Sequence, residues 1–306
     1  MSATPLLLPS IALPPDKSGI CVSISRQEAG WATLDYSVRR LVAGQSWQDD
    51  TREAEAVFVL LGGRLSLDYG GGPQPLGERE NVFAGYPHAA YLPPGTRFEI
   101  TALTTCEFAH AQAPCPPEAR GLAPRLVRPE NVSCEIRGGG NATRQILDIL
   151  PPSFPAARLM VCEVYAPSGN WSSYPPHKHD VHQPPGEVDL DEIYYYRFSH
   201  PDGYAFQRLY DGRGNDHTLR VADGDLVLIR DGYHPVVTAY GYSSYYLNVL
   251  AGSARSMAAS DDPRYAHLRR QWPPPDPRVP VVQPDGPPAG SQAEAGRGHP
   301  GRRPPA

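Results

Sequence analysis

Residues 191–210 read DEIYYYRFSHPDGYAFQRLY, and together with HTLRVADGDLVLIRDGYHPVVTAYG at 217–241 they decide the fold. Both stretches are runs of β-branched and aromatic residues interrupted by Gly, Pro, Asn and Asp, which is typical of short strands joined by tight turns. Similar runs recur from CVSISR at 21–26 to SYYLNVLAG at 244–252. Only DDPRYAHLRRQW at 261–272 predicts a short helix. The sequence therefore predicts an all-β chain with few short helices.

The strand pattern occurs twice. In the first half, EAEAVFVLLGGRLSLDYG at 53–70 precedes NVFAGYPHAAYLPPGTRFEITA at 81–102, and the two stretches quoted above repeat that order. We therefore predict a pair of β-sandwiches or barrels, one over residues 20–124 and one over residues 125–272. Exposed sheet edges favour pairing between copies, so a homo-oligomer is a candidate assembly.

The chain ends in a proline-rich segment. It reads PPPDPRVPVVQPDGPPAGSQAEAGRGHPGRRPPA and begins at Pro273. Its few apolar side chains cannot offset the entropy lost on ordering the backbone. We therefore predict a disordered tail over residues 273–306.

Charge and hydropathy exclude several classes of partner. The formal net charge is -5, so no basic field attracts a phosphate backbone, and nucleic acid is not an expected partner. No stretch approaches the length of a membrane span, and prolines interrupt the apolar start MSATPLLLPSIALPP. Five scattered cysteines are typical of reduced thiols. We therefore expect a cytoplasmic protein, not bound to membranes, that acts on a small molecule.

Four potential metal ligands lie in the second half of the chain. His177 and His179 in SYPPHKHD are two residues apart on a strand-like stretch, so both side chains point to one face. Glu192 opens the next strand, and His234 follows a tight turn after the apolar run DLVLIR. Three imidazoles and one carboxylate delivered by strands can hold a single ion inside a β-barrel.

The donor set indicates the class of metal site. No thiolate lies nearby, which disfavours a structural zinc site. Four nitrogen and oxygen donors leave two positions of an octahedron for water or substrate, which suits Zn, Mn, Fe or Ni. We therefore predict one divalent metal ion. Glu187 and Asp189 are rivals to Glu192 as the carboxylate ligand, but their Pro/Gly-rich loop predicts that both are solvated.

The first half lacks an equivalent set of ligands. No His-x-His pair precedes Glu55, and the half offers only the isolated His88 and His110. We therefore predict that the second barrel binds the metal, while the first has no metal ligands and supports it.

The ligand segments resemble a known family. The His-x-His pair, the Glu at the start of a strand and GDLVLIRDGYH at 224–234 resemble the cupin metal signature, with a longer spacing between His179 and Glu192. The strings SYPPHKHD, EIYYYRF, GYAFQRLYD, VADGDLVLIRDGYHPV and GYSSYYLNVLAG resemble the 5-deoxy-glucuronate isomerases of inositol catabolism, bicupin relatives of the 5-keto-4-deoxyuronate isomerases. The resemblance covers residues 20–272 and implies two cupin-type jelly-roll barrels. The N-terminal extension, the GGGPQPLGERE insertion and the tail depart from the family pattern.

The resemblance also implies an activity and a ligand set. In the family the equivalent residues hold the metal, which implies His177, His179, Glu192 and His234 as ligands. The implied reaction is an aldose-ketose isomerisation of a sugar acid, from 5-deoxy-D-glucuronate to 2-deoxy-5-keto-D-gluconate, in myo-inositol catabolism. Transfer of one proton between neighbouring carbons by a base, or a hydride shift, would use the same ligands. The sequence leaves the general base unassigned.

Four side chains are candidates for substrate contact. Tyr194 and Tyr196 share the Glu192 face of their strand, and either of them or Gln207 would orient substrate oxygens. Arg208 leads as the receptor of the substrate carboxylate, because a guanidinium matches a carboxylate in two-point geometry. Ordinary packing of the tyrosines and a surface ion pair for Arg208 remain open alternatives.

Two other functions are compatible with the same residues. A cupin dioxygenase would use the three histidines and one glutamate to bind iron, and it would consume oxygen on turnover. A sugar-binding bicupin without turnover would need no base beside the metal. Oxygen uptake and product formation therefore discriminate among the three functions.

Overall fold

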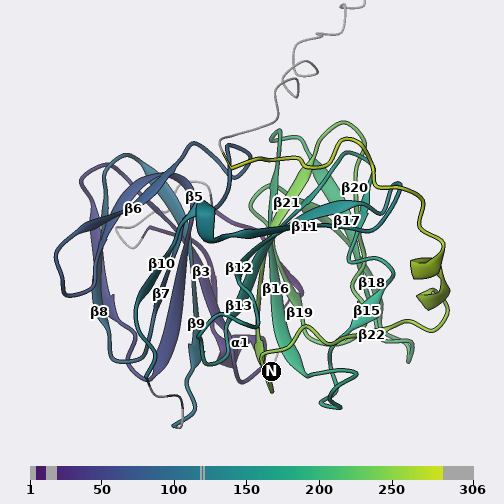
Figure 1. Cartoon of the computed structure of the whole chain (residues 1–306), viewed down its shortest axis with the longest axis horizontal. Helices are drawn as coiled ribbons and strands as arrows, with labels where there is room; N and C mark the ends of the chain where they lie inside the picture. The colour runs from purple at the N-terminus through teal and green to yellow at the C-terminus, as the bar shows by residue number, and fades with distance from the viewer. Residues whose placement is uncertain (1–4, 12–18, 118, 120, 285–306) are drawn as a thin grey trace, which may run out of the picture.

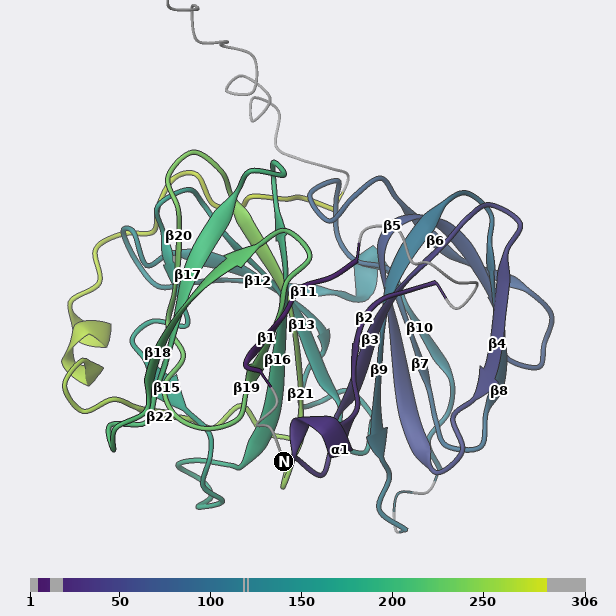
Figure 2. The same cartoon turned by 180° about the vertical axis from the view of Figure 1, so that it is seen from behind.

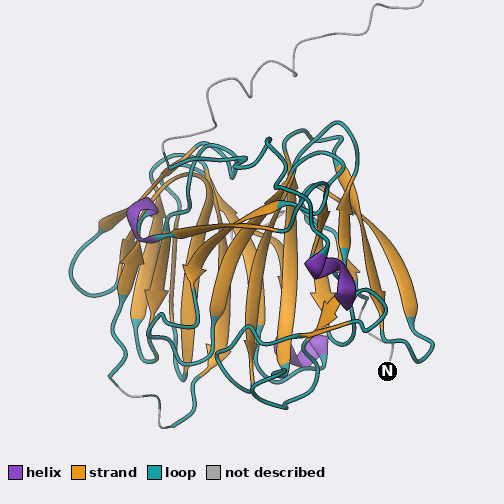
Figure 3. Cartoon of the chain, turned by 45° about the vertical axis from the view of Figure 1, so that its right-hand side comes forward, coloured by secondary structure: helices purple, strands orange, loops and turns teal. Residues whose placement is uncertain are grey.

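The computed structural model describes residues 5–11, 19–117, 119 and 121–284, and nearly all of its regular elements are strands (Figure 3). The helices of this described part are short: α1 (Arg26–Ala29), η1 (Pro129–Asn131) and η2 (Ala266–Arg270). The last of them lies within the segment for which a helix was predicted. No helix in these ranges has the length and apolar character needed to cross a membrane. The prediction of an all-β chain with few short helices is confirmed.

Nine strands of the first half form one barrel. Six of them run in the order β10-β7-β5-β9-β3-β2, and the long β5 also pairs with β6 and β8, which brings in β4. Because β5 pairs with β7 and β9 along one part of its length and with β6 and β8 along another, it joins the two sides of the barrel. The strands are β2 (Ile20–Ile24), β3 (Asp35–Leu41), β4 (Ser46–Asp50), β5 (Ala54–Asp68), β6 (Gln74–Arg79), β7 (Ala89–Leu92), β8 (Arg97–Ala102), β9 (Cys106–Pro114) and β10 (Arg125–Val127).

The second barrel consists of a seven-stranded sheet, β1-β19-β16-β21-β13-β12-β11, and a four-stranded sheet, β14-β20-β17-β18. The first strand of the chain belongs here, because Leu7 and Leu8 pair with Val227 and Leu226. The short β15 and β22 form a separate ribbon. The strands are β1 (Leu7–Leu8), β11 (Ser133–Arg137), β12 (Arg144–Leu150), β13 (Met160–Ala166), β14 (Trp171–Ser172), β15 (His177–Lys178), β16 (Leu190–Phe198), β17 (Tyr204–Tyr210), β18 (Asp216–Ala222), β19 (Leu226–Ile229), β20 (Val236–Thr238), β21 (Ser244–Gly252) and β22 (Ser260–Asp261).

The two barrels pack side by side through their larger sheets (Figures 1 and 2). One buried cluster contains Val57 and Tyr91 of the first barrel together with Leu147, Ile193 and Val249 of the second. We call it the shared core. Because apolar burial is the main favourable contribution to folding, a core common to both barrels joins them into one structural unit.

Strand parity separates this shared core from the interior of the second barrel. On β16, Ile193 and Tyr195 face the shared core, whereas Tyr194 and Tyr196 face inward. The predicted alternation along EIYYYRF is therefore observed. The inward residues form a cluster between the two sheets of the second barrel, which we call the interior cluster: Ile146, Cys162, Val164, Tyr194, Tyr196, Phe198, Ala205, Leu209, Val221, Val227, Ile229, Val236 and Tyr246.

The interior of the first barrel is filled by apolar and aromatic side chains. His110 is buried there and stacks on Phe58, with ring centroids 4.8 Å apart, and Trp47 meets it edge-on at 5.2 Å. Burial, with a smaller effect from Arg39, lowers the pKa of His110 to about 3. This histidine is a neutral packing residue, because no carboxylate joins it and aromatic rings occupy the space around it.

The prediction of disorder from residue 273 onward is wrong for residues 273–284. Gln145 of β12 accepts hydrogen bonds from the backbone N–H groups of Val281 and Val282 at 2.8 and 3.0 Å, and its Nε2 donates to the Val282 carbonyl at 2.8 Å. The Val282 side chain is fully buried in the shared core. Further hydrogen bonds hold the segment to the second barrel: the Asp276 backbone N–H donates to Thr143 Oγ1 at 2.9 Å, and Arg278 Nη2 donates to Asn170 Oδ1 at 3.0 Å. Polar contacts as well as apolar burial therefore order this segment. The rest of the predicted tail, from residue 285, lies outside the described residues.

Candidate metal centre

Three of the four predicted ligands meet at one end of the second barrel. Glu192 lies near the start of β16, His179 follows the short strand β15, and His234 stands in the turn between β19 and β20. One ligand atom from each lies within 4.8 Å of the others, and all three side chains are buried. Two donors bound to one ion at about 2.0 to 2.2 Å are at most about 4.4 Å apart, so the group is nearly compact enough to bind a cation.

The carboxylate stands at the centre of this group. Glu192 Oε2 lies 2.8 Å from His179 Nε2 and 3.3 Å from His234 Nε2. The Nε2 atom of His234 is buried and has no hydrogen-bond partner. An unpaired buried ring nitrogen beside a carboxylate and a second imidazole is the arrangement that a bound cation would complete.

His177 lies beside this group, outside the set of three. Its ring centroid is 4.7 Å from that of His234 and 6.4 Å from that of His179. The ring is therefore adjacent to the candidate site without belonging to the compact set of three.

Backbone carbonyls orient all three imidazoles. The Nδ1 atoms of His177, His179 and His234 lie 3.4, 3.1 and 3.2 Å from the carbonyl oxygens of Pro175, Leu190 and Gly232. A carbonyl oxygen can only accept, so each Nδ1 carries a proton, and the Nε2 atoms of His177 and His234 keep their lone pairs. The Nε2 of His179 instead faces the Glu192 carboxylate at 2.8 Å. A carbonyl bound to the far nitrogen is the usual support of a metal-binding histidine.

The electrostatics of the group favour a cation. Burial lowers the pKa of His234 to about 3, and burial followed by the charges of His179 and Arg144 lowers that of His177 to about 3. Burial opposes ionisation of Glu192, but His179 and His234 hold its pKa below the usual value. His179 differs from the other two imidazoles: burial lowers its pKa, but the contact with Glu192 outweighs burial and raises it above the usual value. A divalent ion bound to Glu192 would take the place of the His179 proton as the partner of this carboxylate.

Three of the predicted substrate contacts lie in the barrel interior. The hydroxyl of Tyr194 is 2.7 Å from Ser173 Oγ, and its ring lies 5.9 Å from that of His234. Tyr196 donates to Gln207 Oε1 at 2.9 Å, whereas the buried Nε2 of Gln207 has no partner. Tyr194 therefore adjoins the candidate metal centre, and Tyr196 and Gln207 extend the buried polar groups from it into the barrel interior.

Two polar residues of this interior were missed by sequence reasoning. Burial raises the pKa of Glu192, and a hydrogen bond from Asn248 assists the two histidines in lowering it. Ser173, with φ +50°, hydrogen-bonds Tyr194 and also lies 3.4 Å from the Tyr246 hydroxyl. Asn248 shares strand parity with Tyr246, which is the one signal that could have located it.

Arg208 lies on the outer surface of β17. It forms a two-point ion pair with Asp216, with Nε to Oδ1 at 2.8 Å and Nη2 to Oδ2 at 2.6 Å. Its side chain is 40% exposed. The guanidinium predicted to receive the substrate carboxylate is therefore already paired with an acidic side chain of this chain.

The prediction that Glu187 is solvated is wrong. Its Oε1 accepts from Lys178 Nζ at 2.8 Å and from the backbone N–H groups of Asp180 and Val181 at 2.9 and 3.0 Å. The loop folds back on itself so that this carboxylate becomes buried. Glu187 therefore positions the His177–Asp180 segment and stays outside the ligand group.

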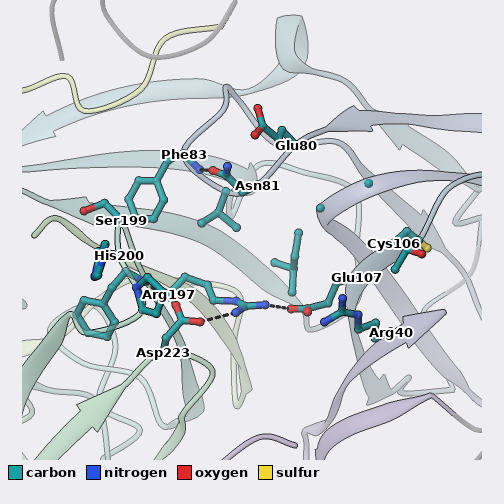
Figure 4. A pocket seen from close by; sticks show the side chains of 17 residues that line it. Arg40, Glu80, Asn81, Phe83, Cys106, Glu107, Arg197, Ser199, His200 and Asp223 are labelled. Carbon is teal, nitrogen blue, oxygen red and sulfur yellow. Dashed lines mark hydrogen bonds and ion pairs between the residues drawn. The ribbon is translucent and has the colours of Figure 1, made fainter. Parts of the chain in front are cut away.

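A separate cavity of about 490 Å³ lies between the two barrels (Figure 4). Its lining contains none of the four predicted ligands. Arg197 crosses it and forms ion pairs with Glu107 and, at 2.6 Å, with Asp223. Arg197 is therefore held by two acidic side chains of this chain, and the cavity is distinct from the candidate metal centre.

Comparison with known proteins gives a consistent result. The KduI/IolB family profile matches residues 8–268. The chain is 42% identical over 253 residues to the 5-deoxy-glucuronate isomerase of Geobacillus thermodenitrificans, covering 81% of this chain and 91% of that protein. It is 37% identical over 236 residues to the Bacillus subtilis 5-deoxy-glucuronate isomerase, covering 76% and 86%.

Solved structures support the fold. The crystal structure of an IolB-like protein from Salmonella typhimurium matches with a TM-score of 0.81 and 37% identity, covering 86% of this chain and 99% of that one. An oxalate decarboxylase from Lactobacillus farciminis matches with a TM-score of 0.60 at 11% identity, covering 85% and 89%. The second likeness concerns fold alone. The prediction of two cupin-type barrels is confirmed.

Proposed function

Because this chain belongs to the KduI/IolB family, we propose that it is a metal-dependent 5-deoxy-glucuronate isomerase, an aldose-ketose isomerase of a sugar acid. The observation that carries the proposal is 42% identity, over 81% of the chain, to a protein of that activity. The reaction would convert 5-deoxy-D-glucuronate to 2-deoxy-5-keto-D-gluconate in myo-inositol catabolism.

The donor set suits a single divalent ion. His179, Glu192 and His234 would hold it, and His177, whose ring adjoins His234, is the proposed fourth ligand. When bound, such an ion supplies Lewis-acid polarisation of the carbonyl oxygen and makes the hydrogen on the neighbouring carbon more acidic. Zinc, manganese, iron and nickel all accept nitrogen and oxygen donors of this kind.

The polar interior side chains would orient the open-chain sugar. Burial raises the pKa of Tyr194 and Tyr196 well above the usual value, so both phenols keep their protons at neutral pH and serve as hydrogen-bonding groups. Gln207 offers its unpaired Nε2 to a sugar oxygen. Hydrogen bonds from these side chains would hold C1 and C2 of the sugar in position for hydrogen transfer between them.

Turnover in deuterated water tests the proposal. The purified protein is depleted of metal, reloaded with zinc, manganese, iron or nickel, and incubated with 5-deoxy-D-glucuronate while NMR follows the ketose. We expect ketose with at least one metal and none after chelation. Deuterium on the former aldehyde carbon, which is C6 of the ketose, would indicate a proton carried by a base, and retention of the substrate hydrogen there would indicate a hydride shift.

Two outcomes would overturn the assignment. Absence of ketose with all four metals would leave a sugar-binding bicupin. Oxygen consumption in step with loss of the sugar acid, measured with an oxygen electrode on the iron-loaded protein, would instead indicate a dioxygenase.

A further inference from the structure

Arg144 points into the second barrel from the first position of β12. It shares strand parity with Ile146, a member of the interior cluster, and is only 3% exposed. Gln145 and Leu147, of opposite parity, face the C-terminal segment and the shared core. The cationic side chain therefore lies on the same face of the sheet as the interior tyrosines.

Arg144 has no acidic partner among the described residues. Its Nη1 donates to the carbonyls of Tyr174 at 3.1 Å and Ala142 at 3.3 Å, and its guanidinium carbon lies 5.9 Å from the Trp272 ring centroid. The contrast is Arg79, an equally buried arginine that binds Glu163 at 2.6 Å. Burial lowers the pKa of Arg144 to about 10. A buried cation without a counter-ion is unfavourable for folding, so the presence of one here points to a ligand that supplies the negative charge.

The guanidinium lies on the side of the candidate metal centre. The Tyr174 carbonyl that it binds is three residues before His177, in the segment that connects β14 to β15. The same contact places the guanidinium on the segment that carries His177, and the parity of β12 places it on the face of the interior cluster. A ligand of the candidate metal centre that reaches the Tyr174–His177 segment would therefore meet this cation.

The remaining donors of Arg144 are suited to an anion. The two carbonyls fix Nη1, so Nε and Nη2, which have no hydrogen bond in the described part of the chain, form the edge that a carboxylate binds at two points. Arg208, by contrast, uses both Nε and Nη2 on Asp216.

We propose that Arg144 binds the carboxylate of the sugar acid and thereby selects uronate-type substrates over neutral sugars. The inference rests on the proposed isomerase function, because it places the carbonyl end of the same molecule at His179, Glu192 and His234. The substrate would replace the missing counter-ion of Arg144. An uncharged sugar would leave that cation desolvated and unpaired, which is the physical source of the selectivity.

Binding of two unreactive alditols separates recognition from turnover. One is 5-deoxy-D-glucuronate reduced at C1, which keeps the carboxylate, and the other is reduced 5-deoxy-D-glucose, which carries an alcohol there. Calorimetry should show that the wild type binds the acid at least about 10-fold more tightly than the neutral alditol. Arg144→Gln should lower the affinity for the acid alditol roughly 10- to 100-fold and leave the affinity for the neutral alditol unchanged. Arg144→Lys, which keeps the charge but loses the two-point geometry, should fall between them.

Arg137→Gln is the matched control. Arg137 faces Arg144 across the β11 and β12 pair, carries the same charge, and is already bound to Glu135 at 2.6 Å. This variant should bind both alditols like the wild type. Bound metal, measured by mass spectrometry, should be equal in all variants, so that a loss of acid binding is not a loss of the metal.

Three results would overturn the inference. They are unchanged acid binding by Arg144→Gln, equal binding of both alditols by the wild type, and a loss of acid binding in Arg208→Gln that Arg144→Gln does not show. If Arg144→Gln fails to fold, Arg144→Lys and the wild-type comparison still decide. A wild type that makes ketose while Arg144→Gln binds the acid normally refutes only this inference. A wild type that binds the acid through Arg144 and never makes ketose refutes only the proposed function.

Discussion

At the scale of single residues, the candidate metal centre depends on how its imidazoles are held. Each Nδ1 faces a backbone carbonyl, and these carbonyls belong to Pro175, Leu190 and Gly232, which lie close to the ligands in sequence or on the neighbouring strand. The protein therefore fixes the ring orientation with its backbone. Side-chain substitutions outside the ligands leave that support in place.

Replacement of His234 tests the centre directly. His234→Ala removes a buried nitrogen that faces Glu192 at 3.3 Å, so metal affinity should fall by at least about 100-fold and ketose formation should cease. Metal titration of the apoprotein measures the affinity. His182→Ala is the control, since this exposed histidine bonds only Ser253 Oγ, at 2.6 Å, in the described part of the chain. Equal metal binding by both variants would contradict the site.

His110 predicts a pH dependence of stability. Its pKa is lowered to about 3 in the folded protein from an ordinary value of 6.5, so between these values the unfolded chain binds a proton that the folded chain does not. The free energy of unfolding should therefore fall as pH drops below 6.5, with a contribution from this residue of about 1.4 kcal/mol per pH unit. His110→Phe should remove that contribution. Urea unfolding from pH 7 to pH 5 measures the two slopes, and identical slopes would refute the assignment.

At the scale of elements, β12 connects three regions of the molecule. Arg144 and Ile146 face the barrel interior, Leu147 faces the shared core, and Gln145 binds the C-terminal segment. Alternating parity allows one strand to serve all three. The segment at 281–282 consequently depends on a single amide side chain rather than on pairing in a sheet.

Gln145→Leu should release the C-terminal segment. The change removes hydrogen bonds of 2.8, 2.8 and 3.0 Å to residues 281 and 282, at an expected cost of about 1 to 3 kcal/mol for that segment. Hydrogen exchange of the Val281 and Val282 amides should accelerate, while that of β16 stays unchanged. Protection equal to that of the wild type would show that apolar packing alone orders the segment.

At the scale of the whole molecule, buried polar groups join the two barrels in addition to their shared core. Glu55 of the first barrel accepts hydrogen bonds from the backbone N–H groups of Ala157, Arg158 and Leu159 at 2.6 to 2.7 Å. Arg79 of the first barrel binds Glu163 of the second, and neither side chain is more than 1% exposed. Two such ties make independent motion of the barrels unfavourable.

The Arg79 pair predicts a large coupling between the barrels. Arg79→Met leaves Glu163 buried without its cation, so stability should fall by about 3 to 5 kcal/mol. Adding Glu163→Leu removes the orphaned charge and should recover part of that loss. Denaturant unfolding of the two single variants and the double variant gives the coupling energy, and strictly additive effects would contradict it.

Much of this organisation could be predicted from sequence, because it depends on local patterns. Alternation along EIYYYRF located the inward face of β16, and the spacing of His179 and the turn before His234 indicated a common site. Arg144 could not be found in this way, since an arginine at the start of a strand is usually exposed. Glu187 was misplaced because Pro/Gly composition does not reveal a loop that folds onto its own carboxylate.

The pairing of β1 with β19 bears on the order in which the chain folds. Leu7 and its partner Val227 are separated along the sequence by the whole of the first barrel. The first barrel can therefore form before Leu7 and Leu8 pair with β19 of the second barrel. A tag fused ahead of Leu7 should therefore slow the pairing of β1 with β19 during refolding and leave formation of the first barrel unchanged.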